Sequence, residues 1–252
     1  MAQQKGFIRL KTGSMGDTTF VKTKDGYRAQ EKMVVNSAKF KTDPAFARVR
    51  ENASNFSRAA KNGQVIRASA NALLQTAKDP KVVSRLVHTI LQIIKKDPVS
   101  PRGQGNIIDG PTLELVGFDF NADAKLTVVV PAVMKPVVNR VTGQITLNMP
   151  SFIPTAGVVP PAGTTHFEIL SAGAEIDFAL GTFVAEQKQT AILPWDSNPT
   201  AAISLVHQVT ANSTLPLFLV AGIKFYQQHN TFMYPLNKQD INALRIIDVN
   251  KV

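Results

Sequence analysis

Three carboxylates close together in the sequence are the first candidates for chemistry. Glu168, Glu175 and Asp177 fall within one short stretch. If a turn separated them, their side chains would face one another, as the paired carboxylates of acid–base catalysis or the oxygen ligands of a calcium site do. Solvated positions along strands explain the same spacing more simply. The sequence leaves both interpretations open.

No other residues form a recognisable catalytic pattern. His88, His166, His207 and His229 are too scattered for a standard set of metal ligands, and none is paired with a carboxylate in a known pattern. Residues 103–105, GQG, lack the remaining features of a dinucleotide fingerprint or a phosphate-binding loop. The absence of cysteine excludes disulfides, thiol catalysis and cysteine-bound metal. We therefore expect no catalytic residue, no metal and no cofactor, and the chain is predicted not to be an enzyme.

Positive charge is concentrated in one part of the chain. The 252 residues carry a formal net charge of +10 at pH 7 and are 44% hydrophobic, enough to bury a substantial core. Residues 1–105 hold 20 Lys and Arg against 7 Asp and Glu, whereas residues 106–252 hold 8 against 11. Such a basic region is attracted to nucleic acid, anionic lipid or an acidic protein surface, or it only keeps the protein in solution.

The sequence shows neither a targeting signal nor a membrane span. The opening MAQQKGFIRLK has no apolar run of the length that a signal peptide needs. The longest later apolar run, from Leu215 to Ile223, is too short to cross a bilayer. The sequence therefore predicts a soluble protein of the cytoplasm.

Two Asp-Pro pairs predict helix starts. Asp43-Pro44 and Asp79-Pro80 each place an N-cap residue before the one helical position that accepts proline. Apolar residues then recur at steps of three and four, which gives each helix an apolar face. Asn62-Gly63 is expected to end the first helix, and a second helix, over about 64–77, precedes the one that starts at Asp79. Short links favour antiparallel packing of the three helices.

A β-hairpin is predicted before these helices. Asp25-Gly26 lies between two strand-like segments of residues 6–32, and Asp-Gly is a strong signal for a hairpin turn. Gly13 and Gly16 mark an earlier turn. Cationic side chains gather on the hairpin and the first helix. They are candidates for partner binding: Lys22, Lys24, Arg28, Arg48, Arg50, Arg58 and Lys61.

The composition changes after residues 98–110, which are rich in proline and glycine and are expected to form a linker or an exposed loop. Beyond them, short β-branched segments predict an antiparallel β-sandwich of Ig-like or jelly-roll topology. We therefore predict an α+β protein with two domains, a basic hairpin and three-helix domain over 1–105 and a β-sandwich over 106–252. The candidate strands are 112–120, 124–130, 144–149, 165–171, 176–184, 201–209, 217–227, 231–235 and 243–249.

Residues 150–163, PSFIPTAGVVPPAG, contain four prolines and predict a long loop instead of a strand. Exposed apolar residues on a loop often contact a partner. The alternative is that the loop folds back as a lid over the sandwich. Trp195, the only tryptophan, is either an anchor for a partner or a corner residue of the core. The apolar candidates for partner contact on this loop are Phe152, Ile153, Val158 and Val159.

The order of these parts resembles a group of Bacteroidota proteins that has no assigned activity. The likeness is carried by Gly13, Gly16, Phe20, residues 25–27 (DGY) and residues 43–46 (DPAF), and further on by AGTTHFEILSAGAEIDF, TAILPW and ANSTLPLFLVAGIKFYQ. The chain also looks like the Plug proteins, small soluble subunits that close the periplasmic mouth of the outer-membrane barrel of the type 9 secretion translocon. This resemblance implies a non-enzymatic role in protein transport, a large barrel as partner and a periplasmic location.

Three classes of function follow. The first is a non-enzymatic interaction protein, plug-like and seated in the mouth of the translocon barrel, with the cationic face and the apolar loop as its contacts. The alternative is a cytoplasmic nucleic-acid-binding protein that uses the same cations together with Arg67. Only Phe20 and Tyr27 are suited to stacking on bases there. The third, a carbohydrate-binding or hydrolytic sandwich, depends on the β-rich tail alone.

Overall fold

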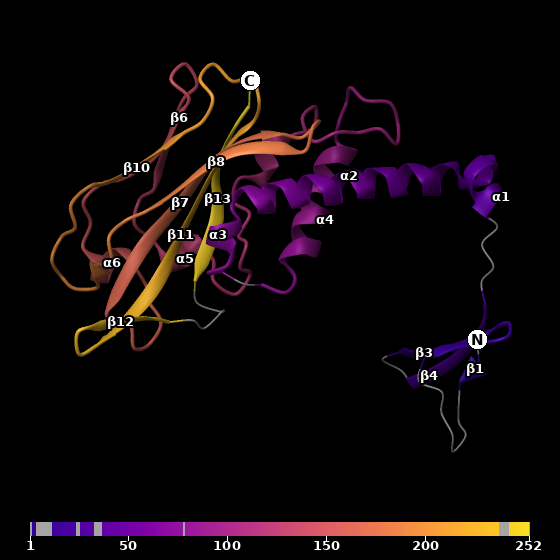
Figure 1. The fold of residues 1–252 in the computed structure, drawn as a ribbon, viewed down its shortest axis with the longest axis horizontal. Helices are drawn as coiled ribbons and strands as arrows, with labels where there is room; N and C mark the ends of the chain where they lie inside the picture. Colours follow the sequence, from indigo (N-terminus) through magenta and orange to yellow (C-terminus); the bar gives the residue numbers. More distant parts are fainter. Residues whose placement is uncertain are drawn as a thin grey trace. The chain divides into compact units, whose positions relative to one another are not determined.

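The computed structural model describes residues 2–3, 12–23, 26–32, 37–77, 79–236 and 242–251. It contains helices, mostly antiparallel sheets and an N-terminal hairpin, and this confirms the predicted α+β class (Figure 1). The chain divides into two compact units, residues 1–50 and residues 51–252.

The first unit contains the predicted hairpin. Its strands form one antiparallel sheet in the order β1-β4-β3-β2. Gly16 turns the chain between β2 and β3 with a φ of 57°, a left-handed conformation that glycine adopts without steric cost. The hairpin of β3 and β4 and the turn at Gly16 are therefore confirmed. The strands are β1 (Ala2–Gln3), β2 (Gly13–Met15), β3 (Thr18–Thr23) and β4 (Gly26–Glu31).

A capped helical turn follows in the first unit. After α1 (Ser37–Thr42), the Asp43 carboxylate accepts a hydrogen bond of 2.8 Å from the backbone N–H of Ala45, and Pro44 opens the 3-10 turn η1 (Pro44–Phe46). Asp43 therefore caps a helical turn, as its pairing with proline predicts.

The first long helix does not end at Gly63, contrary to the prediction. α2 (Ala47–Ser69) runs through this position and is followed by α3 (Asn71–Leu74) and α4 (Val82–Lys95). Gly63 is buried, and a Cβ there would lie 3.4 Å from Ile90 Cδ1 of α4. The missing side chain lets α2 and α4 approach closely. In the sequence, a glycine that permits such a contact looks the same as a glycine that ends a helix.

Two long strands form the centre of the second unit. β7 and β11 pair along ten residues, and the sheet runs β12-β11-β7-β8 with β13 also beside β11 and β9 also beside β7. The predicted strands 165–171 and 176–184 thus contribute one continuous strand, β7, and the start of β8. The strands are β7 (His166–Asp177), β8 (Thr182–Gln189), β9 (Leu193–Pro194), β11 (Leu217–His229), β12 (Phe232–Pro235) and β13 (Ala243–Asn250).

A second, three-stranded sheet has the order β10-β6-β5. Its members are β5 (Lys135–Asn139), β6 (Gln144–Met149) and β10 (Ile203–Gln208). The sequence did not predict β5, which contains Pro136. A proline is tolerated there because β5 is an edge strand, so no neighbour needs the missing N–H.

Alternating side chains of β7 and β11 build two cores. Phe167, Ile169 and the odd-numbered apolar residues of β11 join β6 and β10 in one cluster. Leu170, Ala172 and the even-numbered residues join α2 and α4 in another. Successive side chains of a strand point to opposite faces, so both strands are buried on both sides. The result is three layers, with α2 and α4 on one side of the large sheet and β6 and β10 on the other (Figure 1).

The boundary between the units differs from the predicted one near residue 105. Residues 98–110 are not an open linker, because Gly105 and Gly110 are buried against α4. A Cβ at these glycines would lie 2.5 Å from Ile94 O and 2.6 Å from Ile93 O, respectively. Helices after residue 50 thus share one core with the large sheet, and the compact unit begins at residue 51.

Two predicted strands are short helical turns instead. The segments 112–120 and 124–130 contain η2 (Thr112–Leu115) and α5 (Leu126–Val129). Single hydrogen bonds, such as Phe120 N to Leu244 O, fix the first segment to β13 without forming a full ladder. β-Branched composition alone predicted these strands, but it does not decide whether a neighbouring strand is present to pair with.

Candidate functional site

An open groove of about 560 Å³ runs beside α4 in the second unit. Two hydroxyls in it are used by the helix itself, because Ser84 donates to Lys81 O at 2.9 Å and Thr89 donates to Arg85 O at 3.2 Å. His88 and Lys125 are exposed. The groove is lined by Ser84, Arg85, His88, Thr89, Gly117, Phe118, Asp119, Ala122 and Lys125.

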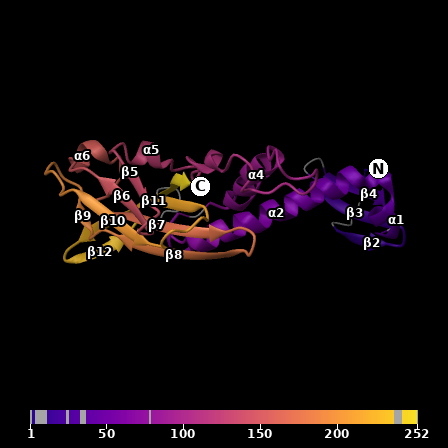
Figure 2. The same cartoon turned by 90° about the horizontal axis from the view of Figure 1, so that it is seen from above.

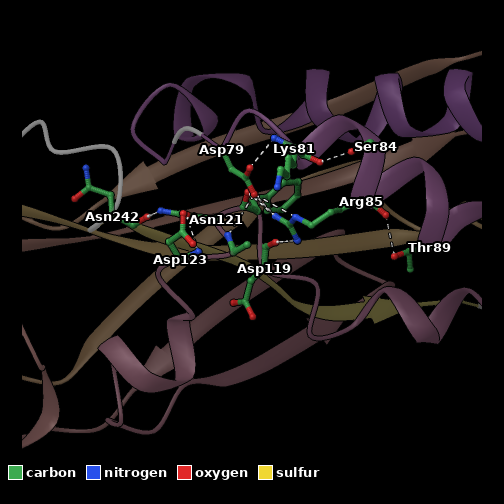
Figure 3. A network of polar contacts seen from close by, with 11 residues as sticks. Asp79, Lys81, Ser84, Arg85, Thr89, Asp119, Asn121, Asp123 and Asn242 are labelled. Atoms are coloured by element: carbon green, nitrogen blue, oxygen red, sulfur yellow. Dashed lines mark hydrogen bonds and ion pairs between the residues drawn. The ribbon is translucent and has the colours of Figure 1, made fainter. Parts of the chain in front are cut away.

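Arg85 fixes the floor of this groove (Figure 3). Its Nη2 and Nε donate to Asp79 Oδ2 at 2.6 and 3.1 Å, and its Nη1 donates to Asp119 O at 2.9 Å. Its Cζ lies 5.0 Å from the ring centre of Phe118. Burial would raise the pKa of Asp79, but hydrogen bonds from Lys81 N, Arg85 and Ala122 N outweigh it and lower the pKa.

Asp119 ties the groove to β13. Its Oδ2 accepts from Arg245 Nη1 at 3.0 Å, and its Oδ1 accepts from Leu126 N at 3.1 Å, at the start of α5. Burial raises the pKa of Asp119, and these partners only partly offset it. The charged groups of the floor are therefore engaged with one another. The groove therefore offers an apolar and cationic contact surface that includes the exposed side chains of His88 and Lys125.

Replacing Arg85 with methionine is expected to lower the free energy of unfolding by about 2 kcal/mol, because the Asp79 side chain, only 6% exposed, loses its counter-charge. Lys96→Met is a matched control. It also breaks an ion pair of 2.6 Å, with Glu114, but these side chains are 54% and 42% exposed, so we expect about 0.5 kcal/mol or less. Urea unfolding followed by Trp195 fluorescence measures the free energy of unfolding of both variants. Equal losses in the two variants would contradict a larger contribution from the Arg85–Asp79 ion pair than from the exposed Lys96–Glu114 pair.

The three clustered carboxylates do not form a site. Glu168 and Glu175 lie in β7, seven positions apart and hence on opposite faces, and both are buried. Asp177 ends the strand and accepts hydrogen bonds from Ala179 N and Leu180 N. The paired-carboxylate interpretation is wrong, and so is the solvated one for the two glutamates.

Ser171 and His207 are a serine–histidine pair that the sequence did not predict. Ser171 Oγ and His207 Nε2 lie 2.9 Å apart, and both residues are fully buried between the two sheets. Burial lowers the pKa of His207 to about 4, so the ring is neutral near pH 7. Because both side chains are enclosed, a substrate has no route to them, and the pair is part of the packing between the sheets.

The predicted cationic candidates divide between the units. In the first unit Lys22 and Arg48 are exposed, Arg28 is half-buried, and Arg50 donates to Phe40 O at 2.7 Å and Asp43 O at 2.9 Å. Lys24 lies outside the described residues.

In the second unit Arg58 Nη1 donates to Gly105 O at 3.2 Å, and Lys61 is exposed. Arg50 and Arg58 thus hold backbone segments in place, in addition to any contact with a partner.

The predicted apolar loop is folded back over the core, which confirms the lid interpretation for two of its four candidates. Val158 is 1% exposed, and Phe152 packs on the core with its ring centre 6.3 Å from that of Phe167. Trp195 Nε1 donates to Val158 O at 3.3 Å, which makes it a corner residue. Val158 therefore offers no surface to a partner.

The other two candidates, Ile153 and Val159, are exposed on a segment that is hydrogen-bonded to a second apolar segment. Val159 N donates to Val129 O at 2.8 Å and Ala132 N donates to Gly157 O at 3.1 Å, so the segments 128–133 and 153–159 lie side by side, with α5 beside α6 (Pro154–Gly157) (Figure 2). Four large side chains on them are exposed. We call these the paired-loop surface: Val128 at 62%, Val133 at 55%, Ile153 at 45% and Val159 at 57%.

Sequence reasoning missed Val128, because 124–130 was predicted as a strand, and it missed Val133, which lies outside every predicted element. The sequence does contain one relevant feature of this region: residues 124–167 contain no Asp or Glu. Among the residues that the structure describes, no three His, Asp or Glu side chains are grouped to hold a metal ion. Within the same described ranges, no helix is long and apolar enough to cross a membrane.

A scan against protein-family models and searches of curated proteins and of solved structures find no match for this chain, so the residues themselves must support any assignment of function.

Proposed function

We propose that this chain is a non-enzymatic interaction protein that docks on a larger protein through the paired-loop surface. The single observation that supports this most is four exposed valine and isoleucine side chains on two segments joined by backbone hydrogen bonds. Apolar side chains gathered on one exposed surface mark interaction sites more often than scattered ones do.

The segments that carry this surface are already ordered. Thr200 N donates to Phe152 O at 2.9 Å and Thr155 N donates to Asp196 O at 3.2 Å, in addition to the bonds between the two segments. Binding therefore immobilises little backbone, which lowers the entropic cost of association. A surface fixed in this way favours a partner of complementary shape over a flexible ligand.

Charge defines the partner further. Lys125 and Lys135 flank the 128–133 segment and are exposed. Asp119 lies within electrostatic reach of Lys125, but the stretch 124–167 itself contains no acidic residue. A partner that presents an apolar patch with acidic residues at its rim complements this arrangement. Such charges steer the encounter and make association sensitive to salt.

The specific partner we propose is the periplasmic mouth of the type 9 translocon barrel, because of the resemblance to the Plug proteins. The purified barrel and this chain are expected to elute together in size-exclusion chromatography at moderate salt. Separate elution at every salt concentration counts against this partner. The variants described next then test docking through the paired-loop surface.

Val133→Asp and Val159→Asp are expected to weaken binding to the partner at least about tenfold, since each buries a carboxylate in an apolar contact. Leu180→Asp is the matched control. Leu180 is 78% exposed in the turn between β7 and β8, outside the paired-loop surface, and its substitution should leave affinity unchanged. Biolayer interferometry with each folded variant measures the affinities. Equal affinities for all variants and the unchanged chain would exclude this surface as the contact.

A further inference from the structure

A small cavity of about 190 Å³ lies where α3 meets β7, β8 and β11. Ala72, Leu73 and Leu170 form its apolar part. Polar residues complete the lining: Thr76 next to α3 and, from three neighbouring strands, Glu168, Gln187, Lys188, Gln189, Lys224 and Tyr226. Its volume is below the roughly 300–1,000 Å³ of pockets for drug-sized ligands, so a ligand that fills it must be smaller.

Two opposite charges line this cavity without neutralising each other. Glu168 of β7 and Lys224 of β11 are direct partners in the antiparallel register, so their side chains leave the sheet on the same face. Nevertheless they form no ion pair. Tyr226 contacts both groups instead: its hydroxyl donates to Glu168 Oε2 at 2.6 Å, and the Lys224 ammonium lies 4.9 Å from the centre of its ring.

The Glu168 carboxylate and the Tyr226 phenol are both buried. Glu168 is 4% exposed and Tyr226 is 7% exposed. Burial, and next the neighbouring carboxylate, raise the pKa of Tyr226, so the phenol remains a hydrogen-bond donor to Glu168. Glu168 thus has one neutral donor and, among the described residues, no cation within ion-pair distance, so a ligand ammonium that reaches it would form its closest charge pair.

We propose that this cavity binds a free α-amino acid with a small apolar or hydroxylated side chain. The ligand ammonium pairs with Glu168, and the ligand carboxylate pairs with Lys224. Amide groups of Gln187 and Gln189 complete the polar contacts, and Ala72 and Leu73 receive the side chain. This site lies apart from the paired-loop surface and does not depend on the proposed docking function.

Isothermal titration calorimetry of the full chain with glycine, alanine and serine tests the proposal at neutral pH. Alanine is expected to bind at one site per chain. N-acetylalanine lacks the ammonium and alanine amide lacks the carboxylate, so both are expected to bind at least about tenfold more weakly. The proposal is overturned if none of the three amino acids binds at about 10 mM, or if both blocked forms bind as well as alanine.

Two variants locate the binding. Lys224→Met keeps the apolar stem and removes the charge, and Glu168→Gln keeps the shape, so each is expected to lose at least about tenfold in alanine affinity. Lys135→Met, on β5, is the matched control and should bind alanine normally. Thermal unfolding establishes that each variant is folded. If Glu168→Gln does not fold, the Lys224→Met variant still tests the proposal, because Lys224 is only half-buried. An unchanged alanine affinity in Lys224→Met overturns the proposal.

Discussion

Replacing Gly173 with alanine is expected to destabilise the second unit by about 3 kcal/mol. Gly173 lies in β7, and a Cβ there would come within 2.5 Å of His207 Cβ, a side chain of the facing sheet that is fully buried. Alanine normally gains roughly 0.5–1 kcal/mol over glycine inside a strand. Overpacking outweighs this gain, because moving the two sheets apart here would loosen the core that they share.

Gly63→Ala is the matched control for this prediction. Gly63 is also buried, but a Cβ there would meet its nearest neighbour at 3.4 Å, an ordinary contact, and alanine favours the helix. We expect no loss of stability, or a gain of up to about 1 kcal/mol. Urea unfolding monitored by Trp195 fluorescence compares the two substitutions. A Gly173→Ala protein as stable as Gly63→Ala would contradict the close packing of the sheets at this point.

Acidification is expected to destabilise the second unit through His207. Burial holds the pKa of His207 at about 4 in the folded protein against an ordinary value of 6.5, and Glu186 and Lys188 nearby act in opposite directions. Between these values the unfolded chain binds a proton that the folded chain does not, so stability falls as the pH falls. The loss amounts to about 3 kcal/mol from neutral pH to about pH 4.

His207→Gln isolates this effect. The substitution removes the titrating ring, so the stability of the variant should depend much less on pH over the same range, whatever its stability at neutral pH. The measurement is the free energy of unfolding in urea at a series of pH values for both proteins. Parallel curves would show that another group causes the pH dependence.

Local signals predicted much of the fold. The β3–β4 hairpin, the Asp43 cap and the helical spacing of Leu86, Ile90 and Ile94 all correspond to elements of the structure, while Asp25 of the predicted turn lies outside the described residues. These features depend on neighbours within a few residues, so a single sequence contains the necessary information.

Features that depend on distant contacts were not predictable. Gly63 reads as a helix end until α4 is placed against it, and Gly105 and Gly110 read as a linker until they meet the carbonyls of α4. The same limit applied to the candidate contacts. Val158 and Val159 are adjacent in sequence, yet one is buried and the other exposed, and only the folded loop distinguishes them.

Polar groups inside the sheets show the same limit. Glu168 was recognised as a chemical candidate, but its neighbours Tyr226 and Lys224 lie on β11, more than fifty residues away. No spacing rule joins them. The antiparallel register of β7 and β11 brings them together, and no local pattern within either strand specifies that register.

Site-specific photo-crosslinking tests the docking account most directly. A photoreactive amino acid is placed at Val159 or, as a control, at Leu180, and the full chain is crosslinked inside living cells that make it. We predict one discrete crosslinked protein from position 159 and none of that size from position 180. The same products from both positions, or none from position 159, would contradict docking through the paired-loop surface.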